Sequence, residues 1–134
     1  MVRNILAAIA GYVAIGVLVV LTDQIFSWAI PGFRTLAMPP LFYFASSLAT
    51  DFVYSAVGGY ICSAIAGSSS HSASLILIVA GEVIGIAVAF ARWQAMPHYF
   101  ALGLLILYPL GIFVGSTFER KRSGLTSRPA LPPL

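Results

Sequence analysis

Two carboxylic acids stand inside runs of apolar residues, and they are the side chains best suited to do chemistry. Asp51 lies within residues 41–67 (LFYFASSLATDFVYSAVGGYICSAIAG), and Glu82 lies within residues 73–93 (ASLILIVAGEVIGIAVAFARW). A charged acid at the centre of a bilayer costs a few kcal/mol, so such an acid marks a functional or a paired position. We expect at least one of the two to be protonated at neutral pH, or paired.

Three interpretations of these acids are open. The first is a proton relay or ion site, because ionisable groups inside membranes often serve transport. The second is a polar clamp, in which protonated carboxyls hydrogen-bond to Ser47, Tyr54, Ser55 or a carbonyl group of a facing helix. The third is a contact between an acid and a cation or donor of a partner subunit.

The composition places the acids in a membrane protein. Of the 134 residues, 60% are hydrophobic and 8% are charged, whereas about a quarter of the residues in a soluble domain are charged. The mean hydropathy of +0.97 fits long membrane-spanning runs. The basic residues stand mainly at the ends of these runs rather than in one patch, which argues against nucleic-acid binding.

The apolar runs predict an all-α bundle of four transmembrane helices, at about residues 4–25, 43–67, 73–93 and 98–118. Residues 119–134 are predicted to form a basic, proline-rich cytoplasmic tail, anchored at lipid headgroups by Arg120, Lys121 and Arg122. Arg3 precedes the first run, so the excess of basic residues places both termini in the cytoplasm.

The predicted second and third helices bring the acids to a similar depth. A short polar loop at 68–72 makes these helices antiparallel neighbours. Asp51 follows Tyr43 by eight residues, which is about 12 Å along a helix. Glu82 precedes Arg92 by ten residues, which is about 15 Å from the same side of the membrane. The two carboxyl groups can therefore lie close together.

Small residues recur at helical spacing on three of the predicted helices. Every fourth residue from Ser47 to Gly67 is small or polar, and residues four apart are neighbours on a helix surface. Such rows let helix backbones approach closely in a membrane. They exceed what four short helices need for packing on each other, which predicts further partners. The predicted packing residues are Ser55, Gly59, Ser63, Gly81, Gly85, Gly103, Gly111 and Gly115.

Signatures of catalysis and of metal binding are missing from the sequence. The only histidines, His71 and His98, have no second ligand three or four residues away. No nucleophile-elbow, Walker or dinucleotide-binding pattern occurs. We therefore expect no enzyme activity and no cofactor of the chain's own. His98, at a helix end, can still serve as an axial ligand to a pigment or haem that a partner holds.

Parts of the chain resemble a loose group of short four-helix bacterial membrane proteins of unknown function. The resemblance rests on DFVYSAVGGYICSAIAG at 51–67, on Arg3-Asn4-Ile5-Leu6, and on Trp93, Pro97 and Phe100 before the last helix. It implies four spans and a location in a bacterial inner membrane. It implies no activity and assigns no site residue.

Together these features predict a non-catalytic accessory subunit of a larger membrane complex, for example a respiratory or photosynthetic one. Its role would be to pack between other integral membrane subunits and lipids. The alternative is a small proton-coupled transporter or channel, which would act as a homo-oligomer through Asp51 and Glu82.

Overall fold

The computed structural model describes residues 1–32, 41–95 and 97–126. These residues form the α-helices α1 (Val2–Ala29), α2 (Leu41–Ala66), α3 (Ser70–Ala91) and α4 (His98–Thr126). A short 3-10 helix, η2 (Gly67–Ser69), joins α2 to α3. The described part of the chain contains no strand, so the predicted all-α class is confirmed for these residues.

Three stretches of the described chain are long and apolar enough to cross a membrane. They are Val2–Ala29, Leu41–Ala91 and His98–Gly124. The middle stretch includes both α2 and α3, so its length is twice what one crossing needs. The helices are thus compatible with an integral membrane protein.

Helix α1 ends later than the sequence predicted, at Ala29 rather than near residue 25. No helix-breaking residue occurs before Pro31, so the helix continues through Asp23 and Trp28. Ile30, which precedes the proline, has an extended backbone (φ −118°, ψ 103°). The proline ring disfavours the helical conformation of the residue before it, which explains this end point.

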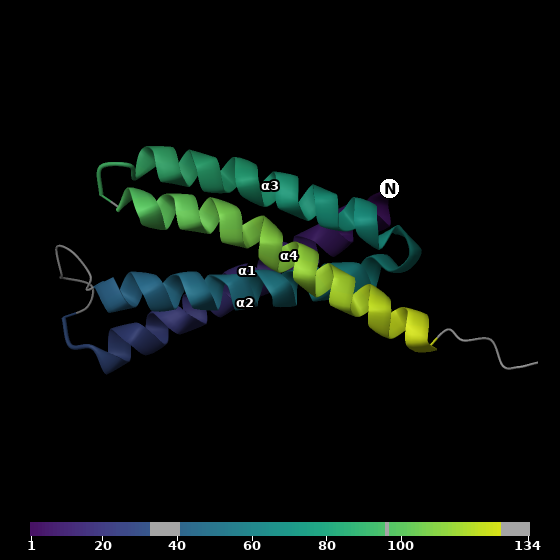
Figure 1. Ribbon diagram of the computed structural model, residues 1–134, viewed down its shortest axis with the longest axis horizontal. Helices are drawn as coiled ribbons and strands as arrows, with labels where there is room; N and C mark the ends of the chain where they lie inside the picture. Colours follow the sequence, from purple (N-terminus) through teal and green to yellow (C-terminus); the bar gives the residue numbers. More distant parts are fainter. Residues whose placement is uncertain (33–40, 96, 127–134) are drawn as a thin grey trace, which may run out of the picture.

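The turn between α2 and α3 depends on Gly67. Its φ of +62° is left-handed, a conformation that glycine adopts without the strain a Cβ would cause. Arg3 supports the same turn from α1, because its Nε donates a hydrogen bond of 2.8 Å to the Ile65 carbonyl oxygen. In Figure 1, α3 consequently runs back alongside the bundle rather than continuing the line of α2.

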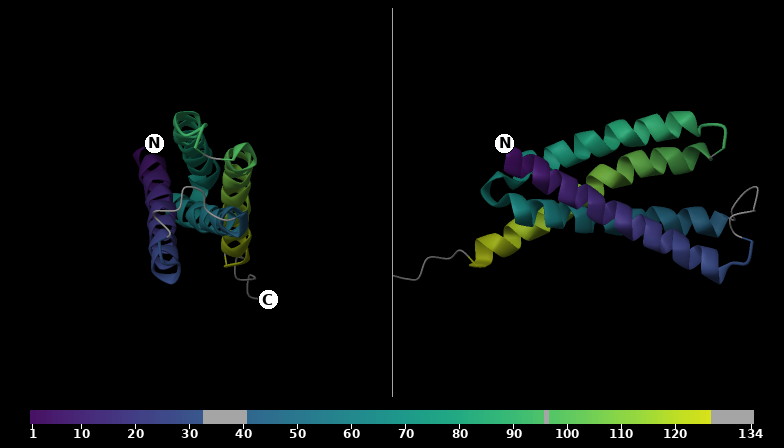
Figure 2. Two further views of the ribbon diagram at one scale, coloured as in Figure 1. Left: turned by 90° about the vertical axis from the view of Figure 1, so that its left-hand side faces the viewer. Right: turned by 180° about the vertical axis from the view of Figure 1, so that it is seen from behind.

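The helices form two antiparallel pairs that cross each other. In Figure 1, α1 lies against α2, α3 lies against α4, and α4 crosses α2 near the middle of the molecule. Figure 2 shows from behind that the pairs diverge towards the end where α1 finishes and α2 begins. The beginning of α1, the α2–α3 turn and the end of α4 lie at the opposite end.

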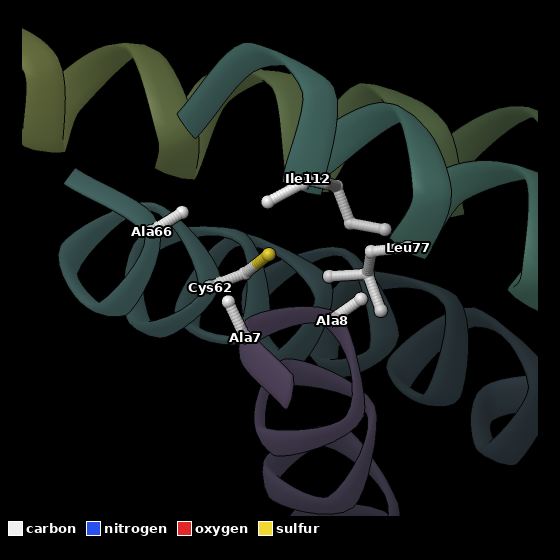
Figure 3. Packing of buried hydrophobic residues seen from close by; sticks show 7 residues of the cluster. Ala7, Ala8, Cys62, Ala66, Leu77 and Ile112 are labelled. Carbon is white, nitrogen blue, oxygen red and sulfur yellow. The ribbon is translucent and has the colours of Figure 1, made fainter. Parts of the chain in front are cut away.

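The core is built where the four helices meet, and its side chains are mostly small. Figure 3 shows Ala7 and Ala8 of α1 facing Cys62 of α2, with Leu77 and Ile112 closing the cluster from α3 and α4. Small residues let the helix axes approach closely, which is the main way that helices associate in lipid. The close crossing at this end therefore fixes where the helix pairs diverge.

Helix α4 continues to Thr126, beyond the predicted boundary at residue 118. It passes through Pro109, which neighbouring helices can make tolerable. The residues after 118 include good helix formers such as Glu119 and Lys121. Arg120 adds a bond from its Nε to the Ser116 carbonyl oxygen at 3.2 Å. The predicted tail residues from 127 onward lie outside the described residues.

Candidate functional site

A cavity of about 440 Å³ lies between the diverging helix pairs, and both acids line it. Asp51 is the contribution of α2, and Glu82 is the acid of α3. Helices α1 and α4 complete the wall with apolar residues and with Tyr12 and Tyr108. The two acids thus share one cavity, and their common depth in a membrane stays a prediction. No hydrogen bond between the two carboxyls occurs in the described structure.

Tyr108 is held in place by the α3 backbone. Its hydroxyl donates a hydrogen bond of 3.2 Å to the Leu77 carbonyl oxygen. Gly81 provides the room for this contact, because a Cβ at that position would lie 2.0 Å from the Tyr108 Oη. Gly81 directly precedes Glu82 in α3. The Tyr108 ring that packs on this glycine therefore lies near Glu82.

One carboxylate oxygen in the site lacks a partner. Within the described residues, Oε1 of Glu82 is buried and makes no hydrogen bond. Buried polar atoms in proteins nearly always have a partner, and an exception calls for a water, an ion or a ligand. The rest of the wall supplies few hydrogen-bond donors, since most of the residues around the cavity are apolar or glycine. The orphan oxygen therefore marks the cavity as a place that can receive a donor.

A second cavity, of about 260 Å³, adjoins the first. Both are lined by Val19, Asp51 and Leu104, and Asp51 is the only acid common to the two linings. The second cavity extends towards Asp23 near the end of α1 and Tyr43 at the beginning of α2. Asp51 consequently stands between a mainly apolar chamber and a chamber that leads towards one end of the bundle.

Hydroxyl groups give the second chamber a more polar lining than the first. Thr22 donates a hydrogen bond of 3.0 Å to the Leu18 carbonyl oxygen. Its single proton is thereby used, so Tyr54 is the donor in the hydrogen bond between the Tyr54 and Thr22 hydroxyls. The Tyr43 hydroxyl lies 3.4 Å from Oδ1 of Asp23, the acid it faces. Ser47 and Thr50 add further hydroxyls to the lining beside Asp51.

The predicted glycine rows lie at the helix crossings inside the bundle. A Cβ at Gly59 would lie 2.4 Å from the Ile112 carbonyl oxygen, and one at Gly115 would lie 1.8 Å from the Ala56 carbonyl oxygen. At Gly111 a Cβ would meet Ser55, and at Gly103 it would meet Leu48. The α2–α4 crossing thus uses four of the predicted positions. A further close approach, which the sequence analysis did not single out, joins Gly58 of α2 to Gly11 of α1.

The predicted serines lie on the buried side of α2. Ser55 and Ser63 are both fully buried. The Ser63 hydroxyl faces Ser74 of α3, with 3.3 Å between the Oγ atoms. Ser55 Oγ has no hydrogen-bond partner within the described residues. The hydroxyl of Ser55 therefore does not clamp Asp51 in this structure.

Gly85 differs from the other predicted glycines. Its Cβ position is 3.5 Å from the nearest atom, Cδ2 of Leu105, which is an ordinary contact distance. Gly16 of α1 has nothing at all within 4 Å of its Cβ position. Both glycines line the first cavity, so their missing side chains help to keep it open.

The basic residues predicted to anchor the tail lie on α4 and contact the bundle. Nη1 of Arg120 lies 3.1 Å from Nδ1 of His71 at the beginning of α3. Arg122 donates a hydrogen bond to the Tyr60 hydroxyl of α2. Lys121, between them, is exposed. Two of the three cations therefore join α4 to the α2–α3 end of the bundle, and their binding to headgroups stays a prediction.

His98, the predicted external ligand, is the exposed first residue of α4. Its ring packs against Trp93, with 4.3 Å between the ring centroids. Across residues 1–32, 41–95 and 97–126, no group of three His, Cys, Asp or Glu side chains could hold a metal ion. A role of His98 towards a partner's pigment or haem stays a prediction.

The sequence analysis did not identify Tyr12 or Tyr108 as site residues. Both carry a hydroxyl within an apolar helix, away from the membrane interfaces where tyrosine is usually enriched. A tyrosine inside an apolar helix was therefore the sequence feature that could have indicated these two site residues. The sequence does not show that both tyrosines line the cavity of the acids. That depends on how α1 and α4 are rotated about their axes relative to α3.

Comparison of the chain with protein-family models, with curated proteins and with solved structures finds no significant match. The resemblance to short four-helix bacterial membrane proteins consequently stays a prediction.

Proposed function

We propose that this protein is a small proton-coupled transporter or channel in which Asp51 is the central ionisable group. The observation that carries the proposal is that Asp51 lines both cavities. A group that takes up and releases a proton must be reachable from a cavity, and both cavities lie in the half of the bundle where the helix pairs diverge. Asp51 lines both chambers, and Glu82 lines the larger one with it.

The cost of keeping acids inside a membrane supports this role. An acid in hydrocarbon destabilises insertion, so it is expected to have a compensating partner or a use. The described structure gives Glu82 Oε1 no protein partner, and Ser55 does not bind Asp51. A purely structural clamp would satisfy these groups, whereas a group that binds and releases protons must be left accessible to them.

The proposal includes four membrane spans with both termini in the cytoplasm. Helices of 26 and 22 residues, α2 and α3, are about 39 and 33 Å long, and each can cross a hydrocarbon core of about 30 Å. The turn at Gly67 reverses the direction of the chain, so α3 runs antiparallel to α2. Arg3 contacts Ile65 and Arg120 contacts His71, so both lie at the end that contains this turn, and basic residues favour the cytoplasmic side. A bacterial inner membrane is the location proposed from the sequence.

The partners of such a carrier are lipids and further copies of the chain. A homo-oligomer is proposed because four helices enclose little volume. Nucleic acid is not among the proposed partners, since the basic residues lie at helix ends rather than in one patch, and Arg3, Arg120 and Arg122 contact other helices.

The test is a flux measurement on the full chain in proteoliposomes. A potassium gradient with valinomycin sets the membrane potential, and an entrapped pH dye reports proton entry. We expect Asp51→Asn to reduce the flux to the level of empty liposomes and Glu82→Gln to reduce it at least tenfold. Glu119→Gln is the matched control, because Glu119 lies outside both cavities and contacts Ser123. Equal flux from wild type and Asp51→Asn would overturn the proposal.

The accessory-subunit function is the second candidate, and Gly16 with Gly85 is the observation that favours it. The other predicted glycines are occupied by contacts within the bundle, so they do not form the surplus that the sequence suggested. Gly85 is the predicted glycine whose Cβ position is not crowded, and Gly16, which the sequence analysis did not list, has nothing within 4 Å of its Cβ position. Both leave room for a neighbouring helix. Under this proposal a tag at the amino terminus recovers stoichiometric membrane subunits in mild detergent. Recovery of the chain alone, or only with its own copies, would refute it.

A further inference from the structure

The chemistry of the 440 Å³ cavity indicates what it would bind. Carboxyl groups from two helices face a space whose other walls are mainly apolar side chains and two tyrosine rings. No Lys, Arg or His is among the described residues that line it. We propose that this cavity is a binding site for a hydrophobic organic monocation, such as a protonated amine with a large apolar body or a quaternary onium ion. The inference rests on the proposed function and names its substrate class.

Size and shape fit an organic ligand. Small-molecule sites in proteins are clefts of about 300–1,000 Å³, lined mostly by apolar residues with a few polar groups. The cavity falls within this range at about 440 Å³. Gly16 and Gly85 leave part of this space unfilled, because neither Cβ position is crowded. The apolar body of a cation would lie against α1 and α3 at these positions.

Charge complementarity fixes the sign of the ligand. Asp51 and Glu82 both carry negative charge when ionised, so a cation between them supplies the opposite charge. The N–H of a protonated amine would in addition donate the hydrogen bond that Glu82 Oε1 lacks. The faces of aromatic rings attract cations as well, and Tyr12 and Tyr108 line the same space. The arginines bound at the far end of the bundle contact Ile65, His71 and Tyr60 instead.

A metal ion fits the cavity less well than an organic cation. Calcium takes six to eight oxygen ligands, and magnesium demands near-octahedral oxygen geometry. The cavity offers two carboxyls, and the Tyr108 hydroxyl is already engaged with the Leu77 carbonyl oxygen. An acyl chain of a lipid would fill the apolar walls, but it would leave the Glu82 oxygen without a partner. The organic cation is the occupant that satisfies both the walls and the acids.

The experiment compares two ions of the same shape and opposite charge. The full chain is reconstituted in phosphatidylcholine nanodiscs, and the binding of radiolabelled tetraphenylphosphonium and of tetraphenylborate is measured separately, with empty nanodiscs subtracted. We expect saturable binding of the cation and at least tenfold weaker binding of the anion. Equal binding of both ions would mean a merely apolar groove, such as a lipid occupies, and would overturn the inference. This comparison uses wild-type protein and needs no variant to fold.

Variants then locate the site. We expect Glu82→Gln and Asp51→Asn each to weaken tetraphenylphosphonium binding at least tenfold, whereas Glu119→Gln binds like wild type. Unchanged affinity in both cavity variants would overturn the inference. Proton flux measured on the same preparations separates the two proposals. Flux without cation binding refutes the substrate class but leaves the transport function standing. Cation binding without flux, when the flux is measured with the cation present, supports the site and refutes transport.

Discussion

Replacing Gly115 by alanine tests the crossing of α2 and α4 more directly than any other single change. A Cβ at this position would lie 1.8 Å from the Ala56 carbonyl oxygen and 2.7 Å from its carbonyl carbon. A carbon–oxygen contact needs about 3.3 Å, so the helices must separate by about 1.5 Å along that line. The atoms in the way are backbone, and no side-chain rotation can remove them.

The separation weakens every contact at the crossing. A gap of 0.5–1 Å already forfeits about a quarter to a half of the attraction between packed atoms. Gly59 and Gly111 share the crossing and meet backbone atoms of the facing helix, so their contacts loosen together with that of Gly115. We therefore expect Gly115→Ala to lower the free energy of unfolding by about 3 kcal/mol, the upper part of the range for overpacked cores. Gly16→Ala is the control, because nothing lies within 4 Å of its Cβ position, and it should change stability by less than about 0.5 kcal/mol.

The assay is reversible unfolding in mixed micelles, with the fraction of SDS as the denaturing variable and circular dichroism with tryptophan fluorescence as probes. Both variants and the wild type are measured at one lipid-to-detergent ratio. If Gly115→Ala unfolds at the wild-type midpoint, or if Gly16→Ala is equally damaging, then α2 and α4 do not cross at these glycines.

Three further predictions address the turn, the site and the topology. Gly67→Ala places a Cβ on a residue with φ of +62° and should lower the free energy of unfolding by about 1 kcal/mol. Gly67→Asn should be milder, because asparagine accepts this conformation. Equal melting temperatures for Gly67→Ala and wild type would contradict the left-handed turn. Tyr108→Phe removes the bond to the Leu77 carbonyl oxygen and should cost about 1 kcal/mol, and a melting temperature that does not fall would show that this bond contributes nothing. In intact cells an impermeant maleimide should label Gln94→Cys but not Ser69→Cys, and labelling of both from one side would rule out a four-span arrangement.

Much of the fold follows from the sequence because long apolar runs have few alternatives in a membrane. Residues 73–93 contain neither proline nor a cluster of charges, and α3 covers nearly the same residues. The ends of α1 and α4 were less predictable, since the end of a membrane run is not the end of a helix. Arg120 continues α4 by bonding back to the Ser116 carbonyl oxygen, a contact that hydropathy alone does not indicate.

The candidate site was predictable only in part. Counting residues from the helix ends placed Asp51 and Glu82 at one depth, and both line one cavity. Counting residues did not predict the second cavity. That cavity forms because Thr22 and Asp23 of α1 lie beside α2. The position of α1 is fixed by the close approach of Gly11 to Gly58. A sequence pattern shows which face of one helix is small, but it does not show which partner helix occupies that face.

The glycines that hold the bundle together differ from the glycines that keep it open, and this difference can be tested by filling the cavity. Gly16 and Gly85 line the space beside the acids, and their Cβ positions are not crowded. A leucine at Gly16 would occupy the volume proposed for the apolar part of a ligand, without changing either carboxyl. We expect Gly16→Leu to remain folded with an unchanged or higher melting temperature, since a well-filled cavity gains packing contacts.

Gly16→Leu should also abolish tetraphenylphosphonium binding. Gly124→Leu is the matched control, because Gly124 likewise has nothing within 4 Å of its Cβ position and lies outside both cavities. Wild-type binding by a stably folded Gly16→Leu protein would show that the space between the helix pairs is not the binding site. Loss of binding with retained stability, together with the loss in Glu82→Gln, would mean that ligand recognition needs both the volume and the charge of this one cavity.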